Sequence, residues 1–435
     1  MLSHRYLPKV LLLAGLLLSL CIFAASGEQL HEAHLPALDN TPPLVKQTIE
    51  KAYENLVSGK QSADDWGEYG KILYANRLRS EAIPALQNAR SLDPENHVWP
   101  YLLAYITLLD SSDKTIAYIE AAYKLKPSSL DVCYLLAETY ASVGELDRAI
   151  SAIQKAYELA PDNLYTNYYY AQLLMTDRQY AASKKYMLKA AQLAPTSSRI
   201  RARLLQIAKY TDIDQSLIPS ASQATDEGDI VYPSSIKAET LSRSRLPANM
   251  HEIARMYMRN HKWRKAEHLY SLLKQHYNLT VEGKSNYAMV LTILRRYDEA
   301  EKIFNELIQE YPDITVYRLG LANLQFITRK PDAGANYQWV LDHAGKDNLK
   351  SRALHGLGII AAGEGNLSRG RDLLQQAVKI NSSSAEMRID LIRVYADLKQ
   401  FDQAFQQLAE AEKLGMHIPA GFRNRLERAR QTGKK

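Results

Sequence analysis

The chain has 435 residues, more than one ordinary compact domain holds, and 46% of them are hydrophobic and 23% charged. This composition is that of an ordered protein, and it excludes a collagen-like, low-complexity or disordered chain. The formal net charge is +6, but residues 1–26 contribute +2 and residues 422–435 contribute +5, which leaves the body at −1. Because a nucleic-acid-binding protein spreads its basic residues over a whole face, this distribution indicates no nucleic-acid partner.

The first predicted element, residues 1–26, has the order of a secretory signal peptide. A short basic region precedes an apolar run at 10–23, and small residues at 24–26 suit cleavage by a signal peptidase. We expect cleavage and a periplasmic or secreted protein with no stable membrane span. The alternative is an uncleaved segment that anchors the protein in the inner membrane, although the apolar run is short for a span. After cleavage Cys133 is the single cysteine, and its apolar surroundings predict a buried side chain.

A periodic region follows the lead-in of residues 27–62, in which one helix is expected. Pro94, Pro127, Pro161 and Pro195 recur at intervals of 33, 34 and 34 residues. A fixed period of this length is typical of repeat proteins, in which each repeat is one supersecondary unit.

One repeat, residues 130–163, shows what each unit contains. Its first half carries apolar residues at i, i+3, i+4 and i+7 from Cys133, which is one face of a helix. Gly144 suits the end of that helix, and a second helical pattern passes through Ala149 and ends before Pro161. Each unit therefore predicts two antiparallel helices, and such pairs bury their apolar faces only by stacking on one another.

This pattern resembles the tetratricopeptide repeat family. The family prefers bulky, small and aromatic residues at fixed positions of its 34-residue unit, and the segment from Ala63 carries them at Trp66, Tyr69, Gly70, Leu73, Ala82, Leu86, Ala89 and Pro94. The resemblance covers most of residues 63–417. It implies an all-α solenoid, in which about nine stacked antiparallel helix pairs form a right-handed superhelix.

The repeats fall into two blocks. The first block spans residues 63–210, and residues 211–246 then lose the period and are rich in serine and acidic residues. This long stretch is either a linker or a functional loop. The second block spans residues 247–417, and residues 418–435 form a basic capping helix and tail, which a solenoid needs at its end.

The resemblance implies that the first helix of each pair lines a concave groove. In the first block the groove-facing positions are Lys71, Tyr74, Asp131, Tyr134, Glu138, Tyr165, Tyr168 and Gln172. The chain has 28 tyrosines and six phenylalanines. Either tyrosine simply replaces phenylalanine in the core, or a tyrosine-rich groove offers a partner large rings with polar tips. We expect Tyr170 to pack in the core, and Tyr165 and Tyr168 to be exposed and of little consequence for stability.

The second block has a more cationic set of groove positions. They are Arg255, Arg259, Arg352, His355 and Arg393. These side chains are either an ordinary solvated surface or a site for an anionic partner.

No motif indicates catalysis, a cofactor or a metal. The stretch 250–255 begins like a zinc-protease motif, but Arg255 stands where the second histidine is needed, and the glycines of 356–361 follow no strand. We expect a non-catalytic exported scaffold that binds a peptide or protein in its grooves, in a cell-envelope assembly. The alternative, since similar solenoids accompany such machines, is an accessory protein of exopolysaccharide or cell-wall synthesis or export that binds or guides a polysaccharide.

Overall fold

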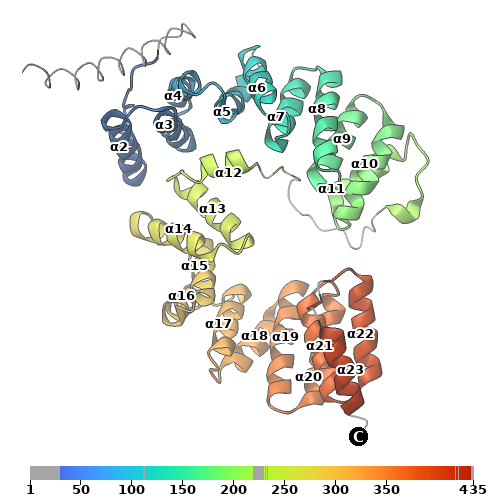
Figure 1. The fold of residues 1–435 in the computed structure, drawn as a ribbon. Helices are drawn as coiled ribbons and strands as arrows, with labels where there is room; N and C mark the ends of the chain where they lie inside the picture. Colours follow the sequence, from blue (N-terminus) through green and yellow to red (C-terminus); the bar gives the residue numbers. More distant parts are fainter. Residues whose placement is uncertain are drawn as a thin grey trace, which may run out of the picture. The chain divides into compact units, whose positions relative to one another are not determined.

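A computed structural model describes residues 30–110, 113–218, 230, 232, 234–416, 418–419 and 421–432. The predicted signal peptide lies outside these residues. Where the chain is described it forms 22 α-helices, two short 3-10 helices and no strand, which confirms the all-α solenoid (Figure 1). The chain divides into two compact units, one that ends at Asn249 and one that begins at Met250.

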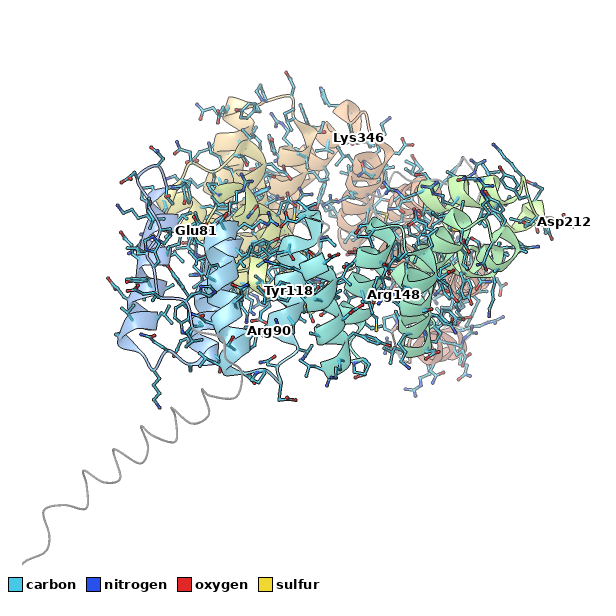
Figure 2. All side chains as sticks on the ribbon, turned by 90° about the horizontal axis from the view of Figure 1, so that it is seen from above. Glu81, Arg90, Tyr118, Arg148, Asp212 and Lys346 are labelled. Atoms are coloured by element: carbon cyan, nitrogen blue, oxygen red, sulfur yellow. The ribbon has the colours of Figure 1, made fainter. Side chains whose placement is uncertain are left out.

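The first unit contains four antiparallel helix pairs. Its helices are α2 (Pro43–Ser58), α3 (Ala63–Ala75), α4 (Arg79–Leu92), α5 (Val98–Thr107), α6 (Asp113–Leu125), α7 (Leu130–Ser142), α8 (Leu146–Leu159), α9 (Leu164–Thr176), α10 (Tyr180–Leu193), α11 (Ser198–Ile207) and α12 (Ser235–Leu241), with the 3-10 helices η1 (Leu108–Asp110) and η2 (Gln215–Leu217). The first helices of the pairs, α3, α5, α7 and α9, form the layer on the side of α12 (Figure 1). The second helices form the outer layer, where Arg90, Tyr118 and Arg148 lie on α4, α6 and α8 (Figure 2).

The second unit contains five further pairs and a terminal helix. Its helices are α13 (Pro247–Arg259), α14 (Trp263–His276), α15 (Val281–Ile293), α16 (Tyr297–Glu310), α17 (Thr315–Ile327), α18 (Ala333–His343), α19 (Asp347–Gly363), α20 (Leu367–Ile380), α21 (Ala385–Asp397), α22 (Phe401–Lys413) and α23 (Phe422–Thr432). The first helices α15, α17, α19 and α21 contact one another in succession, and α23 covers α21 and α22. Among all described helices, none is long and apolar enough to cross a membrane.

Short polar side chains begin the first helices of several pairs. At α3 the Ser62 hydroxyl accepts a hydrogen bond from the Asp65 N–H, and the Asp65 carboxylate accepts one from the Ser62 N–H at 2.9 Å. Ser129 and Asn163 cap α7 and α9 by accepting a hydrogen bond from the N–H of Val132 and of Thr166. Each cap contributes about 1 kcal/mol by satisfying an N–H that the helix leaves without a partner.

The turn inside a pair requires one residue in the left-handed region. Gly144 takes this place with φ of 83°, and in other pairs it is taken by Arg178, Arg295 and Arg329 with φ of 58° to 63°. A basic side chain is favourable there because the C-terminal end of the preceding helix carries a partial negative charge.

Small residues allow the helices to approach closely. Ala137 and Ala149 have no exposed surface, and Cys133 is equally buried, which raises the pKa of its thiol to about 11. At Gly320 an added Cβ would lie 2.4 Å from the Phe304 ring, so α17 accepts that ring only because it has no side chain there. Because such small residues recur at the helix contacts, neighbouring pairs pack closely enough to form a continuous core.

One segment of the first unit departs from the repeat. Residues 230, 232 and 234–246, here called the return segment, run along the layer of first helices, and α12 within it contacts α3 and α5 (Figure 1). They belong to the stretch 211–246, which the sequence identifies as either a linker or a functional loop. The return segment therefore lies on the surface for which the sequence predicts a groove.

Candidate functional site

The first groove is formed by α3, α5, α7 and α9. Of the eight residues that the sequence placed in it, Asp131, Tyr134, Glu138, Tyr165, Tyr168 and Gln172 line one cavity. Lys71 contacts Glu239 of the return segment, and the ring of Tyr74 meets that of Tyr105. Between the groove and the segment remains a cavity of about 340 Å³. Its lining includes seven tyrosines, namely Tyr101, Tyr105, Tyr134, Tyr165, Tyr168, Tyr169 and Tyr232.

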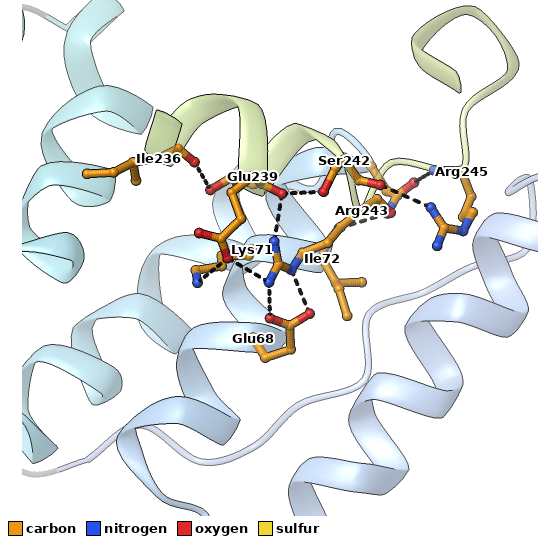
Figure 3. A network of polar contacts seen from close by, with 10 residues as sticks. Glu68, Lys71, Ile72, Ile236, Glu239, Ser242, Arg243 and Arg245 are labelled. Carbon is orange, nitrogen blue, oxygen red and sulfur yellow. Dashed lines mark hydrogen bonds and ion pairs between the residues drawn. The ribbon is translucent and has the colours of Figure 1, made fainter. Parts of the chain in front are cut away.

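A network of charges holds the C-terminal half of the return segment (Figure 3). Arg243 donates two hydrogen bonds of 2.6 Å to the Glu68 carboxylate, one to each oxygen. The same guanidinium lies 3.0 Å from the Glu239 carboxylate, which Lys71 also approaches at 3.4 Å. Because a bidentate arginine–carboxylate pair has a fixed geometry, it defines where the segment sits as well as attracting it.

The pKa of the Glu239 carboxyl reflects this network. Burial alone would raise it, but the nearby Lys71 and Arg243 outweigh burial and lower it. Glu239 therefore stays ionised when the segment is in place, with one cation from α3 and one from its own segment as partners.

Side chains of the groove also contact the backbone of the segment. The Asn76 side-chain amide donates to the Arg243 carbonyl at 3.4 Å, and its oxygen accepts from the Arg245 N–H at 2.8 Å. On α7, the Asp131 carboxylate accepts from the Ser235 hydroxyl at 2.7 Å and from the Ile236 N–H at 3.4 Å. Three of these four contacts, those with Arg243, Arg245 and Ile236, recognise a polypeptide chain as such, since they involve backbone groups.

Aromatic contacts hold the N-terminal part of the segment. The Tyr232 ring lies 4.1 Å from that of Tyr134 and 5.7 Å from that of Tyr165, measured between ring centroids. Tyr165 stacks on Tyr169 at 5.5 Å and donates a 2.6 Å hydrogen bond to Glu138. Burial, and then the charge of Glu138, raise the pKa of Tyr165, so the phenol stays neutral and acts as the donor.

The expectation that Tyr165 and Tyr168 are exposed is wrong. Tyr165 is only 9% exposed and Tyr168 only 4%, close to the 6% of Tyr170, which packs in the core as expected. Tyr232 covers Tyr165, and Tyr168 packs in a core cluster of the last pair, with its hydroxyl accepting a 3.0 Å hydrogen bond from Gln172. Their positions on the helix face are as expected, but the return segment and the neighbouring helix exclude solvent from them.

The groove residues Glu68, Asn76, Tyr101 and Tyr105 were missed from the sequence. Tyr101 is hydrogen-bonded to Ser234 at 2.9 Å, and the Lys237 ammonium lies 4.8 Å above the Tyr105 ring. The ring of Tyr105 in turn meets that of Tyr74 edge-on at 5.9 Å. The i, i+4 spacing of Tyr101 and Tyr105 on α5 was the available signal, but a repeat register counted back from Pro127 points one residue away from them, because this repeat is 33 residues long.

The cationic residues of the second unit are largely paired. Arg255 lies 3.2 Å from Glu252 and 3.4 Å from Glu282. His355 and Arg393 both contact the Asp390 carboxylate, at 2.9 Å and 2.8 Å. The remaining two predicted residues, Arg259 and Arg352, are exposed. This surface is therefore one of mixed charge and does not form a continuous positive site.

Two neighbouring first helices of the second unit expose apolar residues instead. On α15, Met289 and Ile293 are 38% and 44% exposed, and on the neighbouring α17, Phe326 and Ile327 are 38% and 52% exposed. No metal-binding group of acidic, histidine or cysteine side chains occurs in the part of the chain that the structure describes. The second unit thus presents an apolar strip, Met289, Ile293, Phe326 and Ile327, on two neighbouring first helices.

Comparison with known proteins agrees with the helix-pair architecture. Tetratricopeptide repeat family models match residues 130–163, 251–313 and 328–417. The chain is therefore a tetratricopeptide repeat protein. None of the curated proteins compared with it matches.

Solved structures with a similar fold include three repeat proteins. MamA is 23% identical with a TM-score of 0.32 and covers 33% of this chain and 85% of its own. A tetratricopeptide repeat protein from Parabacteroides merdae is 14% identical with a TM-score of 0.28 and covers 80% and 98%. Yeast Tom70 is 12% identical with a TM-score of 0.38 and covers 90% and 93%. Similarities this low carry no argument about function.

Proposed function

We propose that the chain is a non-catalytic scaffold that binds polypeptide segments in the concave grooves of its two units. One observation carries this proposal: the first groove already holds a polypeptide segment, the chain's own return segment, through side-chain and backbone contacts. An aromatic anchor, a serine-capped helical turn and a bidentate arginine are the contacts by which peptide-binding domains hold their ligands.

The second unit supports the proposal in a different way. Its apolar strip consists of Met289, Ile293, Phe326 and Ile327 on two adjacent first helices. Clustered apolar side chains on a repeat protein's concave side are typical of protein-binding surfaces, because they lose contact with water when a partner covers them. Because Arg255, His355 and Arg393 of this unit are paired with carboxylates, we expect a partner of mixed charge more than a strongly anionic one.

Site-specific photo-crosslinking in the native host tests this function. A photoreactive amino acid at Met289 or Ile327 samples the apolar strip, whereas the same group at Ile380 or Leu414 samples exposed apolar positions at the ends of second helices. We expect discrete crosslinked proteins from the first two positions and none from the other two. Equal patterns from all four positions, or no crosslinks at all, would contradict the proposed scaffold function.

We also propose export to the periplasm or beyond the cell, and a role in an assembly of the cell envelope. The order of basic, apolar and small residues at 1–26 supports this, and a chain with this signal would begin near Gly27 or Glu28 after cleavage. N-terminal sequencing of the protein from its native host shows directly whether the signal peptide is cleaved. An intact Met1 would favour the alternative, an inner-membrane anchor.

A further inference from the structure

The return segment is held mainly by polar contacts, unlike the neighbouring helix α11, which buries aliphatic side chains. Its fully buried residues are all hydroxyl-bearing: Ser234 is 5% exposed, Thr240 1% and Ser244 0%. Its apolar side chains Ile230, Ile236 and Leu246 are only half-buried. A structural element of a solenoid usually buries aliphatic side chains, because the hydrophobic effect is its main source of stability.

The neighbouring helix α11 shows the contrast. Ile200, Leu204 and Ile207 of α11 have no exposed surface. α11 therefore belongs to the core of the unit, whereas the return segment lies over the groove and contributes no fully buried aliphatic side chain among its described residues. Water or a competing ligand can replace polar and charged contacts readily. Each such contact also adds less to the stability of the folded chain than a buried apolar side chain does.

The helix within the return segment depends on the groove. α12 has seven residues, and isolated helices this short are unstable in water because their nucleation is unfavourable. Its N-cap, Ser234, accepts from the Lys237 N–H at 3.1 Å and is also bonded to Tyr101 of α5. The segment thus takes its conformation from the groove, as a bound peptide does.

We propose that the return segment is an intramolecular ligand, which a partner peptide of the same chemistry displaces from the first groove. The partner peptide has an aromatic residue two positions before the serine that caps a short helix, and an arginine nine positions after that serine, as Tyr232, Ser234 and Arg243 are spaced here. The aromatic ring meets Tyr134, and the arginine meets Glu68. This inference rests on the proposed peptide-binding function.

Tethering sets the strength of this competition. A segment attached to its own groove competes at an effective concentration of roughly millimolar, so it keeps weak peptides out and admits only a partner that binds tightly or is presented locally. The return segment therefore sets a minimum affinity that a partner must have in order to occupy the groove.

A labelled synthetic peptide of residues 230–246, followed by fluorescence anisotropy, tests the displacement on the full chain. The unchanged chain should bind it weakly, because its groove is occupied. Arg243→Glu in the chain places two carboxylates together, as Arg243 faces Glu68 at 2.6 Å, so the segment should leave the groove. The affinity for the peptide should then rise about tenfold or more.

A charge swap provides the matched control. Glu68→Arg in the chain also disrupts the internal contact, but it should reject the native peptide, whose arginine now faces an arginine. It should bind a peptide that carries Arg243→Glu. This reciprocal pattern separates recognition in the groove from a general loosening of the chain.

The proposal is overturned if Arg243→Glu gives no gain in affinity, or if the Glu68→Arg chain binds the native peptide as well as the Arg243→Glu chain does. Should circular dichroism show that Arg243→Glu is unfolded, Tyr232→Ala removes the aromatic contact instead, and its failure to raise peptide affinity counts equally against the proposal. Crosslinks at Met289 and Ile327 do not involve the return segment. Failure of the peptide test with positive crosslinks would thus refute this inference alone.

Discussion

Truncation of one tyrosine measures how completely the return segment closes the first groove. Tyr165→Ala removes a ring that is 9% exposed and touches the rings of Tyr134, Tyr169 and Tyr232. Loss of a large buried aromatic side chain typically costs 3–5 kcal/mol, and the adjacent cavity of about 340 Å³ lets water reach the vacated space. We therefore expect a loss of about 3 kcal/mol.

The hydroxyl contributes separately from the ring. Tyr165→Phe keeps the ring but removes the 2.6 Å hydrogen bond to Glu138. A hydrogen bond to a charged group contributes about 1.5–3 kcal/mol. Glu138 is half-buried, so water replaces part of the lost contact, and the cost should be about 1.5 kcal/mol or less. Tyr165→Phe should thus lie between the unchanged chain and Tyr165→Ala.

Urea unfolding followed by tryptophan fluorescence isolates the first unit. Of the four tryptophans, Trp66 and Trp99 lie in the first unit and are each 3% exposed, whereas Trp263 and Trp339 lie in the second. In a background of Trp263→Phe and Trp339→Phe the signal comes from the first unit alone, so the midpoint of each variant refers to that unit.

Two outcomes would refute this reasoning. If Tyr165→Ala leaves the urea midpoint unchanged, the ring is open to solvent and the return segment does not cover it. A double-mutant cycle with Tyr232→Ala gives a second check, because rings in contact should be coupled by about 0.5–1.5 kcal/mol. Strict additivity would mean that Tyr232 does not contact Tyr165.

Three further predictions concern other parts of the molecule. Ala149→Leu should destabilise the first unit by about 1–3 kcal/mol, because Ala149 is fully buried between the helices of its pair; an unchanged urea midpoint would contradict this packing. Gly320→Ala should destabilise the second unit by a similar amount, about 1–3 kcal/mol, because the new Cβ meets the Phe304 ring, and Phe304→Leu in the same chain should restore part of the loss in thermal melts. The two cationic neighbours of the Glu239 carboxyl lower its pKa, so its contribution is full above the unfolded pKa of about 4.3 and is lost as the pH falls through the lowered pKa. Glu239→Gln in the chain should therefore raise the affinity for the labelled peptide modestly at pH 7, because this ion pair is exposed, and the difference should vanish in acid.

The sequence by itself determined the repeat architecture. Each tetratricopeptide unit is built from contacts between neighbouring helices, so the 34-residue spacing, the small residues at Ala137 and Ala149 and the stop at Pro161 carry enough information to predict stacked helix pairs. The same spacing predicted which faces of α3, α7 and α9 meet the return segment, because helical periodicity is local. On α5 the predicted face was one residue away from Tyr101 and Tyr105, which contact that segment.

The tertiary structure decided what that face touches. Arg243 reaches Glu68 across 175 residues of sequence, and Ser235 reaches Asp131 across 104. No period connects such residues, and a segment held by hydrogen bonds and ion pairs shows no hydrophobic pattern from which to predict its packing. Burial of Tyr165 likewise depends on a ring supplied by Tyr232, outside the repeats. Local periodicity therefore specifies the groove, whereas its occupant follows from long-range polar and aromatic complementarity that appears only when the chain is folded.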